Sequence, residues 1–467
     1  MLTIAKEYIQ GDGRPGVNPK ADVHLFGQEV NPQTFAVCKS DLFMKSADGK
    51  DAEHVLFGST LSEDRHAGRR FDYLIANPPY GKVWKRDQEA VTTVHERGEA
   101  GRFGAGLPRI SDGQLLFLQH MLTHMKQPSD DGSRVAIIMN GSPLFTGDAG
   151  SGESEIRRWV LENDWLEALV ALPEQMFYNT GIATYVWVLT NRKARERRGK
   201  VQLIDATSFW TLMRKSLGDK RREIPPAKAA EILAIHEAFA DGAHSKLFPT
   251  THFGYRKITV ERPLRLNFQA TPERIARLDA EPGFRNLAVS KKKPGSKAAV
   301  AEEAAGKAEQ EEIRAVLRAL PGRLLKDRLQ FLAALEASAG KPGVRFAAPT
   351  RKAILSALSE RDETAEICRD AEGNPEPDPE LRDYENVPLG ERIEDYFARE
   401  VAPHLPDAWI NTAVRDDKDG QVGKAGYEIN FNRYFYRYVP PRALEQIEAD
   451  IRTAEKEIVQ ALGEVAD

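Results

Sequence analysis

The stretch Phe71-Asp72-Tyr73-Leu74-Ile75-Ala76-Asn77-Pro78-Pro79-Tyr80 determines how the rest of the chain is interpreted. Its apolar run at 71–76 is typical of a buried parallel strand in a layered α/β fold. The tetrapeptide at 77–80 ends that strand, and its two prolines stiffen the backbone because each ring locks its own φ. The stretch therefore predicts a strand with a rigid, polar carboxyl end.

The tetrapeptide has the chemistry to hold a planar amino group. The Asn77 amide oxygen and the Pro78 carbonyl can both accept hydrogen bonds from one exocyclic NH2 group. Tyr80 offers a flat face on which an extruded base can stack. The alternative is a proline-stiffened turn that only ends the strand. The intact run favours the first interpretation and makes Asn77, Pro78, Pro79 and Tyr80 the catalytic candidates.

Further segments follow the tetrapeptide in a recognisable order. They are Ser111-Asp112-Gly113-Gln114-Leu115-Leu116-Phe117 opening an apolar helix, a strand at 134–139, the segments 155–161 and 166–173, and the run Met176-Phe177-Tyr178-Asn179-Thr180-Gly181-Ile182. In their order and in their amino-acid sequence, these segments resemble the modification subunit of type I restriction–modification systems. These subunits are N6-adenine DNA methyltransferases that depend on S-adenosylmethionine. The resemblance covers residues 1–215 well and returns near 385–462. Asn-Pro-Pro-Tyr alone also occurs in glutamine and RNA methyltransferases, so the downstream run is the more specific part.

The resemblance implies a fold and a division of the chain. We expect an α/β fold with the Rossmann-like, mixed sheet of class I S-adenosylmethionine-dependent methyltransferases, its first strand missing, followed by a mainly helical C-terminal region. The expected parts are a catalytic domain at 1–215, a connecting region at 216–286, a flexible linker at 287–311 and the helical region at 312–467. The linker is inferred from its low apolar content.

The expected cofactor loop has no counterpart in the chain. The family places Asp-Pro-x-x-Gly-x-Gly-Gly directly before a helix, because side chains there would block the approach of backbone to the cofactor. Residues 1–9 resemble that helix itself. We therefore expect the loop, its strand and the family's N-terminal helical domain to be missing, through a truncated gene product, a misplaced start codon or fragmentation. This chain alone is expected to bind cofactor poorly, which leaves open that it is inactive.

Two residues are assigned to the cofactor by the resemblance. Glu29 ends the expected strand 23–29, where a carboxylate can accept both ribose hydroxyls. Ser59 follows the next expected strand, at a position where the family usually has an acid that accepts from the adenine amino group of the cofactor. Because a serine hydroxyl accepts more weakly than a carboxylate, the Ser59 contact is the less certain of the two.

Composition narrows the class of protein. The chain has 467 residues, 41% of them hydrophobic, and a net charge of −4. It has no apolar stretch of the ~18–20 residues that a membrane span needs, and no secretory signal, so we expect a cytoplasmic protein. Cys38 and Cys368 stand far apart without metal-ligand spacing, which predicts neither a disulfide nor a metal site. A negative net charge suggests that a partner supplies much of the grip on DNA.

Basic residues are nevertheless clustered. One run is Arg192, Lys193, Arg195, Arg197, Arg198 and Lys200, and another is Arg214, Lys215, Lys220, Arg221 and Arg222. They flank 201–206, which is expected to be a strand at the edge of the domain. The runs are interpreted either as solvated loops that protect a sheet edge or as contacts to DNA phosphates. Segment 81–110, rich in glycine and charge, is expected to be a loop that closes over DNA.

The C-terminal segments point to partners. Residues 426–438 interleave aromatic residues with arginine, which favours a small core or an interface over stacking on bases. The expected helix 443–465 has apolar residues at spacings of three and four, a coiled-coil seam: Leu444, Ile447, Ile451, Ala454, Ile458 and Ala461. In the family this end docks on the specificity subunit, and the restriction subunit joins the full complex.

The resemblance thus implies methyl transfer from S-adenosylmethionine to N6 of a flipped adenine in double-stranded DNA. Asn77 and Pro78 would accept from the amino group, Tyr80 would stack on the base, and Phe177 would pack against its other side or edge. Two alternatives remain open. One is a truncated, non-catalytic subunit that docks the specificity subunit, and the other is methylation of an amino group in a protein or an RNA.

Overall fold

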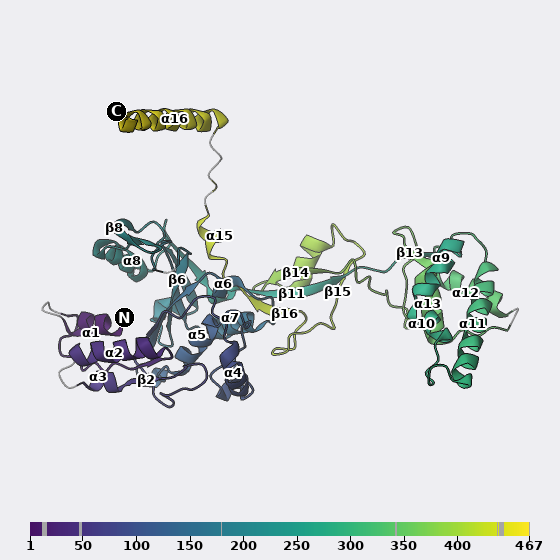
Figure 1. Cartoon of the computed structure of the whole chain (residues 1–467), viewed down its shortest axis with the longest axis horizontal. Coiled ribbons are helices and arrows are strands. Elements are labelled where there is room, and N and C mark those ends of the chain that lie inside the picture. The colour runs from purple at the N-terminus through teal and green to yellow at the C-terminus, as the bar shows by residue number, and fades with distance from the viewer. Residues whose placement is uncertain are drawn as a thin grey trace. The chain divides into compact units, whose positions relative to one another are not determined.

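The computed structural model describes residues 1–11, 16–45, 49–178, 180–340, 343–436, 438 and 443–466, with side chains of the last helix described up to residue 459. The chain forms two compact units (Figure 1). Unit 1 consists of residues 1–254 and 426–467, and unit 2 consists of residues 255–425. Unit 1 therefore extends beyond the expected domain 1–215. It takes in much of the expected connecting region and a C-terminal segment.

A six-stranded sheet lies at the centre of unit 1 and has the order β10-β7-β5-β6-β4-β3. Its strands are β3 (Tyr73–Ala76), β4 (Arg134–Asn140), β5 (Leu166–Leu172), β6 (Thr184–Thr190), β7 (Lys200–Asp205) and β10 (Ser245–Pro249). Strands β3, β4, β5 and β7 point the same way, whereas β6 and β10 run against their neighbours. The expected mixed α/β sheet is confirmed, and the carboxyl ends of the four codirectional strands meet at one edge.

The positions of two strands differ from expectation. Inner strands have fully buried side chains such as Ile137 and Leu169, but β3 lies at the edge of the sheet, where Tyr73 is 73% exposed. The expectation that 71–76 is buried was wrong because β3 has a hydrogen-bonded neighbour on one side only. The expectation that 201–206 lies at the edge was also wrong, since β7 pairs with both β5 and β10.

The N-terminal part of unit 1 contains a second, smaller sheet. Strands β1 (Gly27–Glu29) and β2 (Val55–Phe57) pair in parallel and share no hydrogen-bonded strand with the larger sheet. The segments that lead into the two sheets are in contact. The ring centroids of Phe26, just before β1, and Phe71, just before β3, lie 5.3 Å apart. The helices of unit 1 are α1 (Leu2–Gln10), α2 (Pro32–Lys45), α3 (Lys50–Glu53), α4 (Gln88–His95), α5 (Gln114–Thr123), α6 (Ser142–Phe145), α7 (Gly152–Glu162), α8 (Pro226–Ala238), α15 (Phe431–Phe435) and α16 (Leu444–Ala466).

Unit 2 combines a helical cluster with short strands. Its helices are α9 (Pro272–Ala276), α10 (Pro282–Arg285), α11 (Lys297–Arg318), α12 (Arg328–Gly340), α13 (Ala348–Leu358) and α14 (Ile393–Tyr396). Its strands are β11 (Gly254–Glu261), β12 (Leu266–Phe268), β13 (Ser359–Arg361), β14 (Asp383–Pro388) and β15 (Trp409–Ile410), and β16 (Lys424–Tyr427) returns the chain to unit 1. The expected mainly helical region 312–467 thus contains strands as well.

The expected flexible linker at 287–311 was wrong. Helix α11 occupies most of it and buries Ala299 and Gly306. A side chain at Gly306 would collide with the Leu287 carbonyl, so the helix backbone packs directly against that segment. The misleading signal was low apolar content. Alanine, glutamate and lysine are strong helix formers, and two small residues let this polar helix pack closely.

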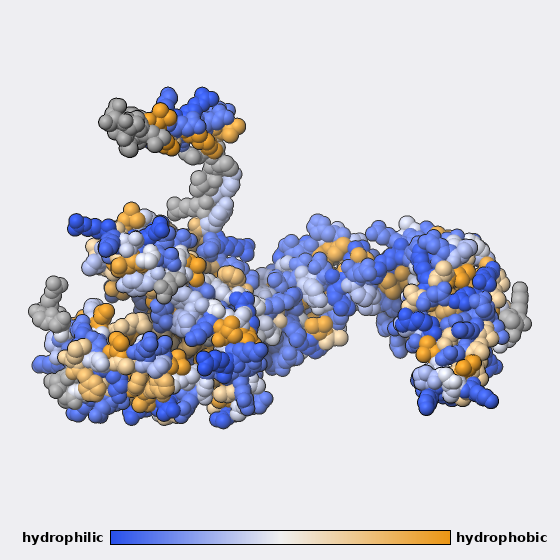
Figure 2. Space-filling model, viewed as in Figure 1, coloured by the Kyte–Doolittle hydropathy of each residue, from blue (hydrophilic) through white to orange (hydrophobic). Residues whose placement is uncertain are grey.

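The C-terminal segment of unit 1 is buried in its first part and exposed along its last helix. Tyr427, Ile429 and Phe431 are buried, and the Phe431 ring lies 5.3 Å from Tyr185 of β6, so the first half of the aromatic run packs as expected. Tyr436 and Tyr438 in its second half are exposed. Helix α16 forms as expected, but hydrophobic surface remains visible along it (Figure 2). Among the helices that the structure describes, none is both long enough and apolar enough to span a membrane.

Candidate active site

The tetrapeptide Asn77–Tyr80 lies at the carboxyl end of β3, on the sheet edge where β4, β5 and β7 also end. Pro78 is buried whereas Asn77 and Pro79 are exposed, so Pro78 anchors the turn and the amide stays accessible. The Tyr80 hydroxyl donates a hydrogen bond to Asn77 Oδ1 at 2.7 Å. In open α/β sheets this edge is where ligands bind.

Tyr80 stays protonated in this environment. Burial raises the pKa of its phenol to about 12, while the hydrogen bond to Asn77 acts in the opposite direction. Desolvation disfavours the charged phenolate, which accounts for the sign of the shift. The hydroxyl is therefore a hydrogen-bond donor throughout the physiological pH range, and the Asn77 oxygen is its acceptor.

Phe177 lies beside Tyr80, although about a hundred residues separate them in the sequence. Their ring centroids are 6.3 Å apart and their planes meet at 76°. Such edge-to-face packing is favourable for aromatic pairs. The two rings form adjacent walls rather than parallel plates, so a planar group stacked on one ring would meet the edge or face of the other. The sequence run at 176–182 that singled out Phe177 includes residue 179, which lies outside the described residues.

A polar network between the start of α5 and the end of the neighbouring strand β4 was not anticipated from the sequence. Gln114 Nε2 donates to both carboxylate oxygens of Asp112, at 2.9 and 3.0 Å, and to Asn140 Oδ1 at 3.1 Å. Gln114 Oε1 in turn accepts from the Asn140 backbone N–H. Asn140 ends β4, next to β3. The network ties the start of α5 to this edge of the sheet, and the helix-opening motif at 111–117 was its only sequence signal.

Segment 81–110 is folded rather than an open loop. It contains α4 and a core formed by Trp84, Val91 and Phe103 together with Leu61 and Leu116. The expectation of a loop that closes over DNA did not anticipate this core. Its apolar residues are spread thinly among glycines and charges, so periodicity does not reveal them.

The two cofactor candidates lie on adjacent strands. Glu29 ends β1, and its Oε1 accepts from the Asn31 backbone N–H at 2.7 Å. Ser59 follows β2 and donates its hydroxyl to Asp87 Oδ1 at 2.8 Å. The Ser62 hydroxyl bonds the same carboxylate oxygen. Asp87, just before α4, was missed by the sequence reasoning. Asp87 brings a carboxylate next to Ser59, the position at which the sequence itself has a serine in place of the family's usual acid.

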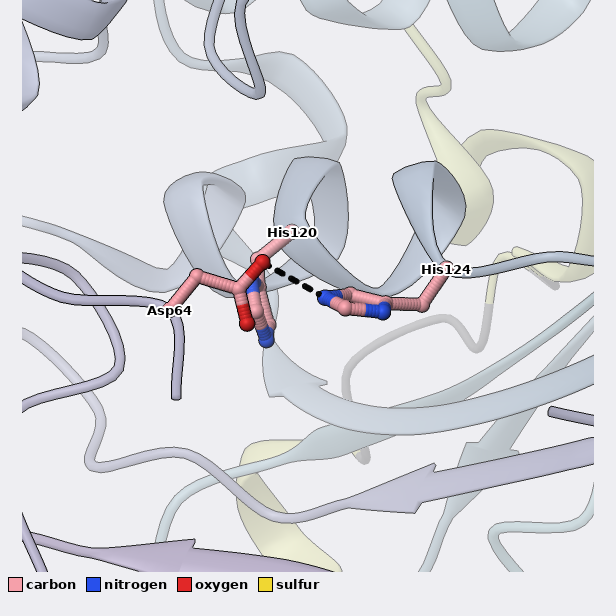
Figure 3. Close-up of side chains that lie close together, drawn as sticks. All are labelled: Asp64, His120 and His124. Atoms are coloured by element: carbon pink, nitrogen blue, oxygen red, sulfur yellow. Dashed lines mark hydrogen bonds and ion pairs between the residues drawn. The ribbon is translucent and has the colours of Figure 1, made fainter. Parts of the chain in front are cut away.

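A third polar cluster joins the segment after β2 to helix α5 (Figure 3). Asp64, His120 and His124 place possible ligand atoms within 4.8 Å of one another, a spacing that could hold a metal ion. Both His124 nitrogens already have partners, however, with Nε2 3.1 Å from Asp64 Oδ2 and Nδ1 2.8 Å from the Arg69 carbonyl.

The surroundings of His120 disfavour a cation. Arg102 Nη1 lies 2.9 Å from His120 Nδ1, so a ring lone pair and the nearby space are taken by a positive group. Burial, His124 and Arg102 lower the pKa of His120 to about 3. The cluster is best explained as a hydrogen-bonded anchor between the two segments.

Comparison with known proteins assigns the chain to a family. The sequence model of the N-6 DNA Methylase family matches residues 1–248. The chain belongs to this family. The match covers more than half of the chain and corresponds closely to the continuous part of unit 1.

Individual relatives are methylase subunits. The chain is 28% identical over 199 residues to the HindI type I restriction enzyme methylase subunit of Haemophilus influenzae, covering 42% of this chain and 41% of that protein. It is 22% identical over 262 residues to the MjaIX type I restriction enzyme methylase subunit of Methanocaldococcus jannaschii, covering 56% and 44%. The matches thus span less than half the length of these relatives.

A solved structure is also similar in sequence. It is the methyltransferase subunit of a type I restriction–modification system from Streptococcus thermophilus, 26% identical, with a TM-score of 0.41 and coverage of 50% of this chain and 46% of that chain.

Proposed function

We propose that the chain is the methyltransferase subunit of a type I restriction–modification system and methylates N6 of adenine in double-stranded DNA. The observation that carries the proposal is the Asn77–Tyr80 turn at the ligand-binding edge of the sheet, with the Phe177 ring 6.3 Å from Tyr80. Membership of the N-6 DNA Methylase family and the similarity to type I methylase subunits support it.

In this proposal the tetrapeptide holds the target amino group. The Asn77 amide oxygen and the Pro78 carbonyl accept its two N–H groups, which directs the nitrogen lone pair away from the acceptors. Because both acceptors are preorganised by the prolines, little reorganisation is needed at the moment of reaction. Tyr80 stacks on the flipped base, and Phe177 packs against its other side or edge.

S-adenosylmethionine is the proposed cofactor and supplies an electrophilic methyl group when bound. Glu29 would accept from its ribose hydroxyls, and Ser59 together with Asp87 would face its adenine. These side chains fit, because a carboxylate offers about four acceptor sites and the described bonds leave some of them open.

The proposed partners are double-stranded DNA, the specificity subunit and, in the full complex, the restriction subunit. The specificity subunit would bind α16, where Leu444 is 67% and Ile458 59% exposed. A helix with an unpartnered apolar seam gains stability by packing against another helix. DNA sequence recognition would then lie in the partner chain.

The proposal is tested in the source organism by deleting the gene and sequencing the genome with a method that detects N6-methyladenine. We expect methylation of one defined sequence motif to disappear and to return when the gene is restored. A methylation pattern that deletion leaves unchanged would contradict the proposal. A change confined to methylated glutamine or to RNA would instead support the alternative amino-group substrates.

A further inference from the structure

A basic β-ribbon stands apart from both sheets of unit 1. Strands β8 (Thr211–Leu217) and β9 (Lys220–Glu223) pair only with each other. The ribbon carries the second basic run of the sequence: Arg214, Lys215, Lys220, Arg221 and Arg222. In the described part of the chain, no acidic side chain forms an ion pair with any of these residues. Against these five basic residues the ribbon has two acidic ones, Asp219 and Glu223, so it carries an excess of positive charge in a protein whose net charge is −4.

The ribbon is attached to the loop that carries Phe177. The Asp219 backbone N–H donates to the Tyr178 carbonyl at 3.0 Å, and the Arg221 N–H donates to the Gln175 carbonyl at 3.0 Å. The Lys220 ammonium also lies 5.2 Å from the centre of the Tyr178 ring. Backbone bonds on both sides of Phe177 thus hold the ribbon next to the proposed base-binding rings.

The topology places the ribbon at the same edge of the sheet as Asn77. The ribbon follows the carboxyl end of β7, and β7 points in the same direction as β3. At the ribbon's base, the Arg222 guanidinium lies 4.0 Å from the centre of the Trp210 ring, an arrangement favourable for a cation and an aromatic face. This contact fixes the base of the ribbon that carries the other basic side chains.

The first basic run has a different role. Arg192 pairs with an aspartate of the loop before β4, Lys193 is buried against Asp164, and the buried Arg197 lies 3.6 Å from a Glu167 oxygen. These residues precede β7 and so lie near its amino end, opposite the proposed active site. Three of the six charges in the first run are thus paired within the fold, and the run lies away from the sheet edge that carries Asn77. The ribbon and the exposed Lys82, Lys85 and Arg86 after Tyr80 are basic features on the Asn77 side.

We infer that the β8–β9 ribbon binds the phosphate backbone of duplex DNA next to the adenine held at Asn77–Tyr80. The inference rests on the proposed function, and it assigns the positioning of the duplex to this ribbon. Lys and Arg side chains neutralise phosphates and release counterions, which makes binding strongly salt-dependent. Such contacts fix the register of a protein on DNA without reading its sequence.

The test measures the salt dependence of DNA binding. The full chain is titrated into a fluorescein-labelled duplex of about 30 base pairs, and anisotropy is followed between about 50 and 200 mM KCl, a range in which phosphate contacts change affinity strongly. The variant Arg214→Gln/Lys215→Gln/Arg221→Gln removes exposed charges only. We expect the slope of log K against log [KCl] to flatten by about 2–3, since each phosphate contact contributes about 0.9.

A matched control is Arg195→Gln/Arg198→Gln/Lys200→Gln, which removes three exposed cations of the first run near the opposite edge. It should leave the slope unchanged, and both variants should keep the melting temperature. A triple variant with the wild-type slope would overturn the ribbon's role while leaving the proposed function intact. Failure of the unaltered chain to bind duplex DNA at about 50 mM KCl would overturn the inference, whereas the proposed function is tested separately by the gene deletion. Equal flattening in the control would show a general charge effect and would also overturn the inference.

Discussion

The Tyr80 hydroxyl and the Asn77 side-chain oxygen are joined by a hydrogen bond of 2.7 Å. This oxygen is the acceptor that the proposed mechanism requires for the target amino group. An amide oxygen has two lone pairs, so it can accept from Tyr80 and from the base together. The bond therefore orients the Asn77 amide before substrate arrives.

Replacing Tyr80 separates its two proposed roles. Tyr80→Phe keeps the ring and removes one neutral hydrogen bond, a change of about 0.5–1.5 kcal/mol, so methylation by the assembled enzyme should fall by roughly 2–10-fold. Tyr80→Ala also removes a stacking face, whose loss costs about 1–3 kcal/mol per base, and should weaken DNA binding further. Equal effects of the two variants would argue against stacking.

The raised pKa of Tyr80 leads to a second prediction about the same residue. Because its pKa is about 12, the phenol keeps its proton between pH 7 and 10. The pH profiles of wild-type and Tyr80→Phe enzyme should therefore have the same shape over this range. An alkaline loss of activity that disappears in Tyr80→Phe would show that Tyr80 ionises in the site.

The His120 cluster predicts how stability depends on pH. The pKa of His120 is lowered to about 3, below the ~6.5 of an unfolded chain, so only the unfolded state takes up this proton between those values. Stability should thus decrease as pH falls below about 6.5. His120→Asn, which can still accept from Arg102, should lower the melting temperature at pH 7.5 but flatten its decline towards pH 5. Parallel melting curves for both proteins would contradict the assignment.

Helix α16 predicts an assembly defect without a folding defect. Ile451 is 53% exposed, so Ile451→Asp should leave the melting temperature of the isolated chain close to unchanged. The same change should disrupt co-purification with the specificity subunit, because a charge would enter the helix–helix seam. Gln446→Asp introduces the same residue outside the seam and should be neutral. A large drop in melting temperature for Ile451→Asp would place the helix in the chain's own core.

Local sequence patterns predicted most elements of the fold, but not which strands pair with one another in the sheet. The strand at 71–76 and the terminal helix were found from apolar periodicity, which reports on local structure. Which strand occupies an edge depends on long-range pairing, and this is why β3 and β7 were misplaced. Helix α11 was missed because composition was interpreted as disorder, although alanine-rich charged segments also form stable helices.

The candidate site was predictable where a motif carried it. Asn77, Tyr80 and Phe177 were identified from their sequence context, and the structure brings Tyr80 and Phe177 together. Asp87 and Asn140 were not found, because an isolated acid or amide in a polar loop has no distinguishing pattern. Their contacts form only when segments distant in the sequence fold together, Asp87 with Ser59 after β2 and Asn140 with Gln114 at the end of β4.

The central claim is that Asn77 acts on the target amino group during methyl transfer. The most direct measurement is the transfer rate of the Asn77→Ala variant in the assembled enzyme, with tritiated S-adenosylmethionine and unmethylated duplex DNA. Loss of a preorganised hydrogen bond at the reacting centre predicts a fall of roughly 100–1,000-fold, with cofactor affinity nearly unchanged. Wild-type turnover by this variant would contradict the account.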